Sequence, residues 1–222
     1  MLTAVAIIPS PPLLVPELAG AAAAEVADLR DAVLRAASAL PQRWIAVGAG
    51  GAEDRVAPSA AGTFAGFGVD VPVALSPGAW PVTELPLCAL ITGWVRGQVR
   101  PDAVAEVRCY ADDPDPAAIG RALRAELDAT PDPVGVLVVA DGCRTLTPSA
   151  PGGHHPADAA VQQALDDALG RGDGVALTDL PASVVGRVAF GVLSGLAEQS
   201  AAQELYRGAP YGVGYFAGVW QP

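Results

Sequence analysis

Side chains that could do chemistry gather in one stretch of the 222-residue chain. Asp141-Gly-Cys-Arg144 follows an apolar run, and the two histidines, His154 and His155, come shortly after it. Imidazole and carboxylate groups serve as acid–base catalysts and as metal ligands. Adjacent side chains of an extended segment point to opposite sides, so the two histidines are interpreted first as an exposed loop pair. A relocated metal or acid–base site that uses one of them is the alternative.

Arg144 is the strongest candidate for ligand binding, because it follows a predicted strand on a glycine-containing turn. A guanidinium there could bind a carboxylate or a phosphate through two parallel hydrogen bonds. It could equally pair with Asp141 or Glu17 and close a cavity. A replacement metal site would combine His154 or His155 with Asp141 or Glu17. The catalytic candidates that remain open are therefore Arg144, His154 and His155.

Two turns follow predicted strands and would position further groups. The strand at residues 2–8 runs directly into Pro9-Ser10-Pro11-Pro12. Prolines fix φ and push the preceding residue toward extended geometry, so Ser10 is held in a defined direction at the carboxyl end of this strand. In α/β proteins ligands bind at that end. The strand at residues 44–47 runs into Gly48-Ala-Gly50-Gly51, which is typical of a tight turn.

The order of apolar runs and helical patterns predicts an α/β fold. Buried strands are predicted at residues 2–8, 44–47, 71–75 and 134–139, with a more alternating edge strand at 104–110 and a closing strand at 211–219. Helices are predicted at residues 19–40, 85–99, 115–128, 156–169 and 182–197, with a further helical stretch at 201–206. This alternation indicates a layered fold with a central mixed sheet and helices on both faces. Because no polar low-complexity linker interrupts the chain, we predict one domain over residues 1–222.

The charge balance excludes several classes of partner. The chain has 13 basic residues, all arginine and scattered along the sequence, against 24 acidic residues, which gives a net charge of −11. Nucleic-acid binding requires a basic stripe, and an anionic membrane surface would repel this chain. No apolar run approaches the ~20 residues of a membrane span. We therefore expect neither nucleic-acid nor membrane partners.

The three cysteines, Cys88, Cys109 and Cys143, are widely spaced. Their number and spacing predict neither a disulfide framework nor a CxxC metal pair. Cys143 has no evident base beside it, so it is predicted to be a buried, small hydrophobic side chain. The cysteine usage favours a reducing compartment, and the apolar start of the chain is too short for a signal peptide. We therefore predict a cytoplasmic protein.

Three segments together resemble a known family. They are Ile7-Ile-Pro-Ser-Pro-Pro-Leu-Leu-Val-Pro-Glu-Leu18 at the start, Asp141-Gly-Cys-Arg-Thr-Leu-Thr-Pro-Ser-Ala-Pro-Gly-Gly-His154, and the tail Ala209-Pro-Tyr-Gly-Val-Gly-Tyr-Phe216. In these segments the chain resembles the class III extradiol dioxygenases, the family of the catalytic subunit of protocatechuate 4,5-dioxygenase. The resemblance extends over most of the chain and implies that family's single α/β domain.

The resemblance also implies where a site would lie. Family members hold iron with two histidines and one carboxylate and use a further histidine as general acid–base. The iron-binding histidines correspond to Ser10 and Gly50, and the acid–base histidine corresponds to Arg144. The carboxylate corresponds to Val184 or Val185. The resemblance thus implies a divergent member whose metal-ligand positions are replaced. The expected ligand pocket contains Ser10, Gly50, Asp141 and Arg144.

Three functions are compatible with these replaced positions. The first is a protein without iron-dependent ring cleavage and without a cofactor, which binds a small, anionic ligand or a partner at the old pocket. The second is a working Fe(II)-dependent dioxygenase that uses the replacement ligands named above. The third is a structural subunit, as in two-subunit members of the family, and self-association into a homo-oligomer is also compatible with the resemblance. Whether the chain is an enzyme stays open at this point.

Overall fold

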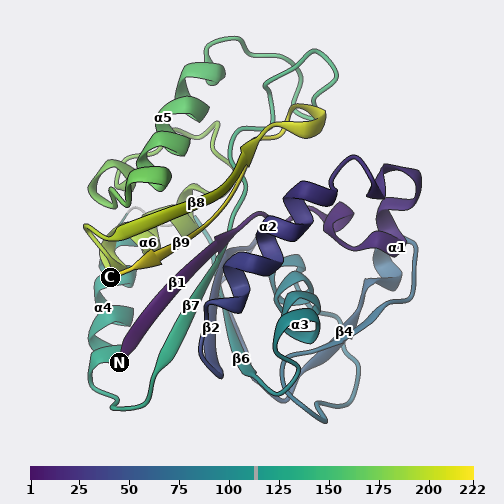
Figure 1. Ribbon diagram of the computed structural model, residues 1–222, viewed down its shortest axis with the longest axis vertical. Helices are drawn as coiled ribbons and strands as arrows, with labels where there is room; N and C mark the ends of the chain where they lie inside the picture. Colours follow the sequence, from purple (N-terminus) through teal and green to yellow (C-terminus); the bar gives the residue numbers. More distant parts are fainter. Residues whose placement is uncertain (113–114) are drawn as a thin grey trace.

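The centre of the molecule is a sheet whose middle strands are parallel. The computed structural model describes residues 1–112 and 115–222, and these residues form a sheet of seven strands in the order β3-β6-β2-β7-β1-β9-β8 (Figure 1). The parallel strands are β6 (Val104–Tyr110), β2 (Arg43–Ala49), β7 (Val134–Val139) and β1 (Leu2–Ile8). The antiparallel strands at the two sides are β3 (Asp54–Val56), β9 (Tyr215–Gln221) and β8 (Ala201–Gly208).

Continuous apolar runs form the middle strands because both faces of the sheet are covered. Every residue of β7 is buried, and β1 and β2 are buried along most of their length. Parallel strands that helices cover on both sides have unbroken hydrophobic sequences of this kind. The strands predicted at residues 2–8, 44–47 and 134–139 are confirmed, and so is the α/β fold class.

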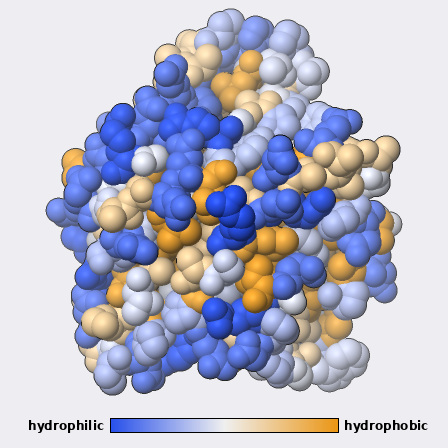
Figure 2. Space-filling view, viewed as in Figure 1, coloured by the Kyte–Doolittle hydropathy of each residue, from blue (hydrophilic) through white to orange (hydrophobic). Residues whose placement is uncertain are grey.

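Helices cover both faces of this sheet (Figure 1). The helices α2 (Ala27–Ser38) and α3 (Leu87–Val99) pack on one face, with the short α1 (Pro16–Ala19) beside them. The helices α4 (Pro116–Asp128), α5 (Asp158–Arg171) and α6 (Arg187–Leu196) pack on the other face. The buried side chains accordingly form two apolar cores, one on each side of the sheet. Figure 2 shows the face that carries α2, where hydrophilic side chains dominate the rim and hydrophobic ones are visible near the centre.

Glycines allow α4 and α6 to approach each other very closely. A Cβ built on Gly120 of α4 would lie 2.0 Å from the backbone oxygen of Val192. A Cβ built on Gly195 of α6 would lie 1.9 Å from the backbone oxygen of Ala117. Because any larger residue would collide with backbone, these two glycines fix how the helices cross.

The predicted helices at 85–99, 115–128 and 156–169 form close to their expected bounds. A side-chain cap starts α4: the Asp115 carboxylate accepts a hydrogen bond from the amide of Ala118 at 2.9 Å, and Pro116 is the first helical residue. The helix α5 ends at Gly172, whose φ of 70° is a left-handed cap. Among the helices of the described residues, none combines the length and the apolar character needed to cross a membrane.

Two predicted helices differ from the structure. The helix predicted at 182–197 begins only at Arg187, so that residues 182–186 form a turn. The helix predicted at 19–40 is wrong in its first part, because Gly20 adopts a φ of 54° and ends α1 there. A 3-10 helix at Gly20–Ala23 and a turn at residues 24–26 separate α1 from α2.

The stretch at residues 201–206, predicted as helical, is the strand β8. Alanine, glutamate and leucine, which occur in this stretch, have high intrinsic helix propensities. In the fold their backbone pairs with β9, and this pairing outweighs the local preference. The closing strand predicted at 211–219 begins at Tyr215 instead, because Tyr211 turns the chain with a φ of 58°.

Two further strands form, but their positions in the sheets differ from the prediction. The strand predicted as an edge at 104–110 lies inside the sheet as β6, because β3 pairs with its outer side. The strand predicted at 71–75 shortens to β5 (Pro72–Ala74) and pairs with β4 (Ala61–Thr63) in a separate two-stranded sheet. The sequence of the short strands β3 and β4 carries no strand pattern, because each has only three residues.

The carboxyl ends of the parallel strands lie level with one another. Val138 of β7 pairs with Ile7 of β1 on one side and with Val47 of β2 on the other. Gly48 of β2 in turn pairs with Cys109 of β6. The segments that follow these four strands therefore emerge at one edge of the sheet, where ligands bind in α/β folds.

Candidate functional site

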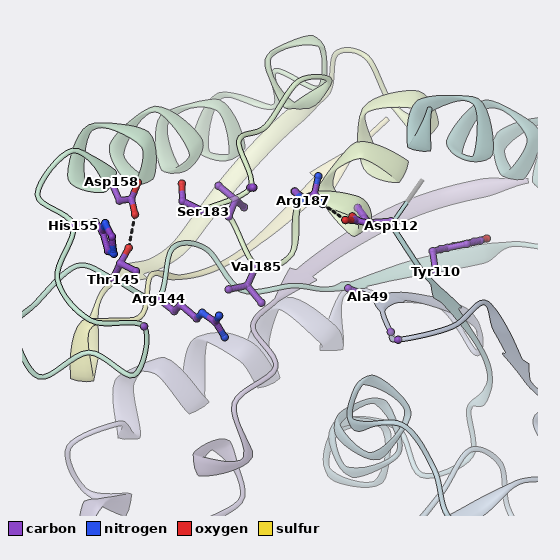
Figure 3. A pocket seen from close by; sticks show the side chains of 16 residues that line it. Ala49, Tyr110, Asp112, Arg144, Thr145, His155, Asp158, Ser183, Val185 and Arg187 are labelled. Atoms are coloured by element: carbon purple, nitrogen blue, oxygen red, sulfur yellow. Dashed lines mark hydrogen bonds and ion pairs between the residues drawn. The ribbon is translucent and has the colours of Figure 1, made fainter. Parts of the chain in front are cut away.

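An open pocket lies at the carboxyl edge of the sheet. It has a volume of about 840 Å³, and its walls are the segments that follow β2, β6 and β7 together with the turn before α6 (Figure 3). Ala49 and Val185 contribute apolar surface to it. The charged and polar side chains of its lining include Arg144, Arg187, His155, Asp158 and Ser183. A pocket of this size and mixed lining suits a small organic molecule.

Arg144 reaches into this pocket without a partner for its charge. The residue is exposed, and its guanidinium extends from the loop after β7 toward Val185 and the middle of the pocket (Figure 3). Its stem packs on Gly152, where a Cβ would come within 2.8 Å of the Arg144 Cγ. Among the described residues, no side chain forms a hydrogen bond or ion pair with this guanidinium. The pairing with Asp141 or Glu17, one of the two sequence-based interpretations, is not formed.

Asp141 is held by Ser10 instead. Its two carboxylate oxygens accept hydrogen bonds from the amide and the hydroxyl of Ser10, each at 2.7 Å. Burial raises the pKa of the Asp141 carboxyl, and the hydrogen bonds from Ser10 act in the opposite direction. Burial also raises the pKa of Tyr215, with a smaller contribution from the Asp141 charge. The structure thus brings together two residues of the predicted pocket, but they contact each other and neither lines the pocket.

His155 lines the pocket, whereas His154 does not. The amide of His155 donates to the carbonyl of Thr145 at 3.0 Å, and the Thr145 hydroxyl donates to the Asp158 carboxylate at 2.5 Å. These bonds fix the loop between β7 and α5 and orient the Asp158 carboxylate. Both histidines are exposed loop residues, as the first interpretation of the sequence expected.

The predicted replacement ligands do not assemble into a metal site. Glu17 lines a different hollow beside Trp94 and Arg96, because α1 lies on the opposite face of the sheet from α5. Asp141 is engaged by Ser10. Within the part of the chain that the structure describes, no three His, Cys, Asp or Glu side chains form a group that could hold a metal ion. Asp141, Glu17, His154 and His155 therefore form no such group among the described residues.

Three of the four positions identified by the resemblance surround the pocket. Gly50 lines it from the turn after β2, Arg144 lines it from the loop after β7, and Val184 and Val185 line it from the turn before α6. These segments are far apart in the sequence and meet only because the strands end at the same edge. The fourth position, Ser10, lies outside the lining.

An ion pair that the sequence analysis did not identify lies at the same pocket. Arg187, the first residue of α6, donates to the carboxylate of Asp112, which lies in the segment after β6 (Figure 3). Because the two charges neutralise each other, Arg187 attracts a bound anion less strongly than Arg144 does. The only sequence feature that could have indicated this site is the position of Asp112 just after a predicted strand. Nothing in the sequence around Arg187, its remote partner, indicates the ion pair.

Cys143 lies behind the pocket as a buried side chain, as predicted. Its thiol is 3.9 Å from the hydroxyl of Ser183, and its amide donates to the side-chain oxygen of Gln162 at 2.8 Å. Burial raises the pKa of the Cys143 thiol. Because burial disfavours its thiolate and both other cysteines belong to the core on the opposite side of the sheet, Cys143 is assigned a structural role.

The fold has a counterpart among solved structures. The uncharacterized protein JW3007 from Escherichia coli K12 is similar with a TM-score of 0.57, over 99% of this chain and 100% of that chain, at 13% sequence identity. This similarity shows that the two proteins share an α/β fold. No protein-family model matches the chain. No curated protein matches it either.

Proposed function

We propose that this chain is a divergent relative of the class III extradiol dioxygenases that binds a small organic anion at the carboxyl edge of its sheet. Three sequence segments that resemble the family support the relationship. It is also supported by an α/β sheet whose loops bring Gly50, Arg144 and Val185 around one pocket. That grouping is expected if the pocket is the family's site with altered side chains.

The side chains at these positions do not fit iron. Gly50 has no side chain, Val185 offers only carbon, and the Arg144 guanidinium has no lone pair to donate. The hydroxyl of Ser10, the remaining position, is engaged by the Asp141 carboxylate at 2.7 Å. A site of two histidines and one carboxylate needs three donors around open positions. No ring-cleavage step is therefore assigned to this pocket.

The observation that carries the proposal is the guanidinium of Arg144, which has no ion-pair partner among the described residues. The other arginine of the lining, Arg187, is paired with Asp112. A carboxylate would satisfy Arg144 through two parallel N–H···O bonds. The apolar surface of Val185 and Ala49 would contact a hydrocarbon body. A small apolar carboxylate therefore fits this pocket better than a phosphate ester, because a single unpaired arginine would balance only part of the charge of a phosphate.

Calorimetric titration with benzoate tests this function. Benzoate combines one carboxylate with an apolar ring, and inorganic phosphate provides a purely ionic comparison. We expect the wild type to bind benzoate more tightly than phosphate. Arg144→Ala should weaken binding by roughly ten-fold or more, because a hydrogen bond between charged groups contributes about 1.5–3 kcal/mol. Arg144→Lys keeps the charge without the planar fork and should bind with intermediate affinity.

Arg171→Ala is the matched control, because Arg171 is exposed at the end of α5 and lies outside the pocket. It removes the same charge and should leave the affinity for benzoate unchanged. The melting temperature of Arg144→Ala should stay close to that of the wild type. Equal affinity of Arg144→Ala and wild type, or no benzoate binding by the wild type, would contradict the proposal. Tighter binding of phosphate than of benzoate would overturn the carboxylate assignment.

A further inference from the structure

Two cysteines that are far apart in the sequence meet inside the molecule. The sulfur atoms of Cys88 and Cys109 lie 2.9 Å apart. Both residues are buried, with 4% and 1% of their surfaces exposed. Cys88 belongs to the first turn of α3, and Cys109 lies near the end of β6. The contact therefore joins a helix to the sheet on which it packs.

The two free thiols are close to the geometry of a disulfide. A disulfide joins its sulfur atoms at about 2.05 Å, so a displacement of less than about 1 Å would bring these atoms to bonding distance. The two groups share a hydrogen bond. This bond lowers the pKa of Cys109 and raises the pKa of Cys88. The hydrogen bond thus stabilises a thiolate on Cys109, with the Cys88 thiol as its donor.

The third cysteine is separate from this pair. Cys143 packs in the core on the other side of the sheet, whereas Cys88 and Cys109 belong to the same core. Its thiol lies 3.9 Å from the hydroxyl of Ser183. Cys143 therefore serves as an internal reference for any chemistry of the pair.

We propose that Cys88 and Cys109 form a reversible disulfide, with hydrogen peroxide as the oxidant. The Cys109 thiolate attacks one peroxide oxygen and becomes a sulfenic acid, and the other oxygen takes up a proton and leaves as water. The Cys88 sulfur then attacks the Cys109 sulfur and loses its proton, and the sulfenic oxygen leaves as a second water. Overall, two thiols lose two electrons and two protons, and one peroxide becomes two waters. A dithiol reductant reverses the bond by thiol–disulfide exchange.

The pair lies directly against the end of β2 and the turn that follows it, and this turn lines the pocket. A Cβ built on Gly48 would come 2.4 Å from the Cβ of Cys88, and one built on Gly50 would come 3.2 Å from the Cβ of Cys109. Oxidation would therefore fasten α3 to β6 next to this turn. The modification itself does not depend on which ligand the pocket binds, so it is tested without one.

Alkylation and mass spectrometry of the full chain test the proposal. The folded protein is treated with hydrogen peroxide, unfolded in the presence of iodoacetamide, and weighed intact. We expect the number of alkylated cysteines to fall from three to one. Without alkylation the chain should lose the mass of two hydrogen atoms, and peptide mapping should find Cys88 linked to Cys109. Dithiothreitol should restore all three thiols.

Serine variants provide the controls. Cys143→Ser should still form the bond, so that none of its two remaining cysteines is alkylated after peroxide treatment. Cys88→Ser and Cys109→Ser should form no intramolecular link, and circular dichroism should confirm that they fold. Three alkylated cysteines in the peroxide-treated wild type would overturn the proposal. Sulfinic acid on either residue without a link, or a link that involves Cys143, would overturn it as well.

Discussion

The hydroxyl of Ser10 donates to one carboxylate oxygen of Asp141 at 2.7 Å, and the amide of Ser10 donates to the other oxygen at the same distance. The turn after β1 is thereby tied to the turn after β7 across the carboxyl edge of the sheet. Because burial raises the pKa of Asp141, its charged form depends on these two donors. At the position where the resemblance implies an iron-binding histidine, Ser10 is therefore the structural partner of a half-buried acid.

Ser10→Ala should destabilise the fold by about 1–2 kcal/mol, because it removes a hydrogen bond from a half-buried carboxylate. Urea denaturation at neutral pH measures the free energy of unfolding. The difference from the wild type should shrink in acid, since a protonated Asp141 depends less on the hydroxyl donor. Ser10→Thr keeps the hydroxyl and is the control, with a smaller loss expected. An unchanged free energy of unfolding in Ser10→Ala would contradict this role.

The purified protein should hold no stoichiometric iron, even after anaerobic loading with Fe(II). The positions that would hold iron lack metal-binding atoms, because Gly50, Arg144 and Val185 offer no ligand. The hydroxyl of Ser10 is engaged by Asp141. Elemental analysis before and after loading measures the metal content. Iron near one equivalent per chain, lost when His154 and His155 are changed to alanine, would show that a relocated metal site exists.

Asp166 should make the free energy of unfolding depend on pH. Burial raises the pKa of this carboxyl to about 6, and the side chain of Gln162 donates to it at 2.8 Å. Aspartate in an unfolded chain titrates near about pH 4, so the folded state binds more protons between these values. The contribution of Asp166 to stability therefore falls as the pH rises from about 4 through 6.

Asp166→Asn should remove this dependence, because it keeps an oxygen that can accept from Gln162 but carries no charge. Relative to the wild type it should be more stable by on the order of 2 kcal/mol at neutral pH and nearly equal below about pH 4. Chemical denaturation at several pH values measures the difference between the two proteins. A constant difference across the pH range would mean that Asp166 does not titrate in this window.

Gly120→Ala should destabilise the fold by about 2 kcal/mol or more, because its Cβ would lie 2.0 Å from the backbone oxygen of Val192. The matched control is Gly97→Ala in α3, an exposed position where a Cβ meets nothing within 4 Å. This change should stabilise the protein by up to about 1 kcal/mol through helix propensity. Thermal and urea denaturation of both variants make the comparison. Similar effects of the two substitutions would argue against close contact between α4 and α6.

The middle of the fold could be predicted because its strands are apolar at nearly every position. A strand that is apolar at every position, such as residues 134–139, is typical of a sheet whose two faces are both covered. This pattern already implies helices on either side. The helix predicted at residues 201–206 does not form, because its backbone pairs with another strand. The local preference of these residues is helical, and the partner that makes them a strand, β9, comes later in the chain.

The sequence by itself determined that Arg144 lies at the carboxyl end of a buried strand, since it closely follows the apolar run at residues 134–139. Only the tertiary structure decided that Arg187 has a partner there while Arg144 has none among the described residues. Likewise, the contact between Cys88 and Cys109 depends on how α3 packs against β6. Local patterns determine which segments form. Distances between side chains of remote segments follow from packing, which depends on the whole chain.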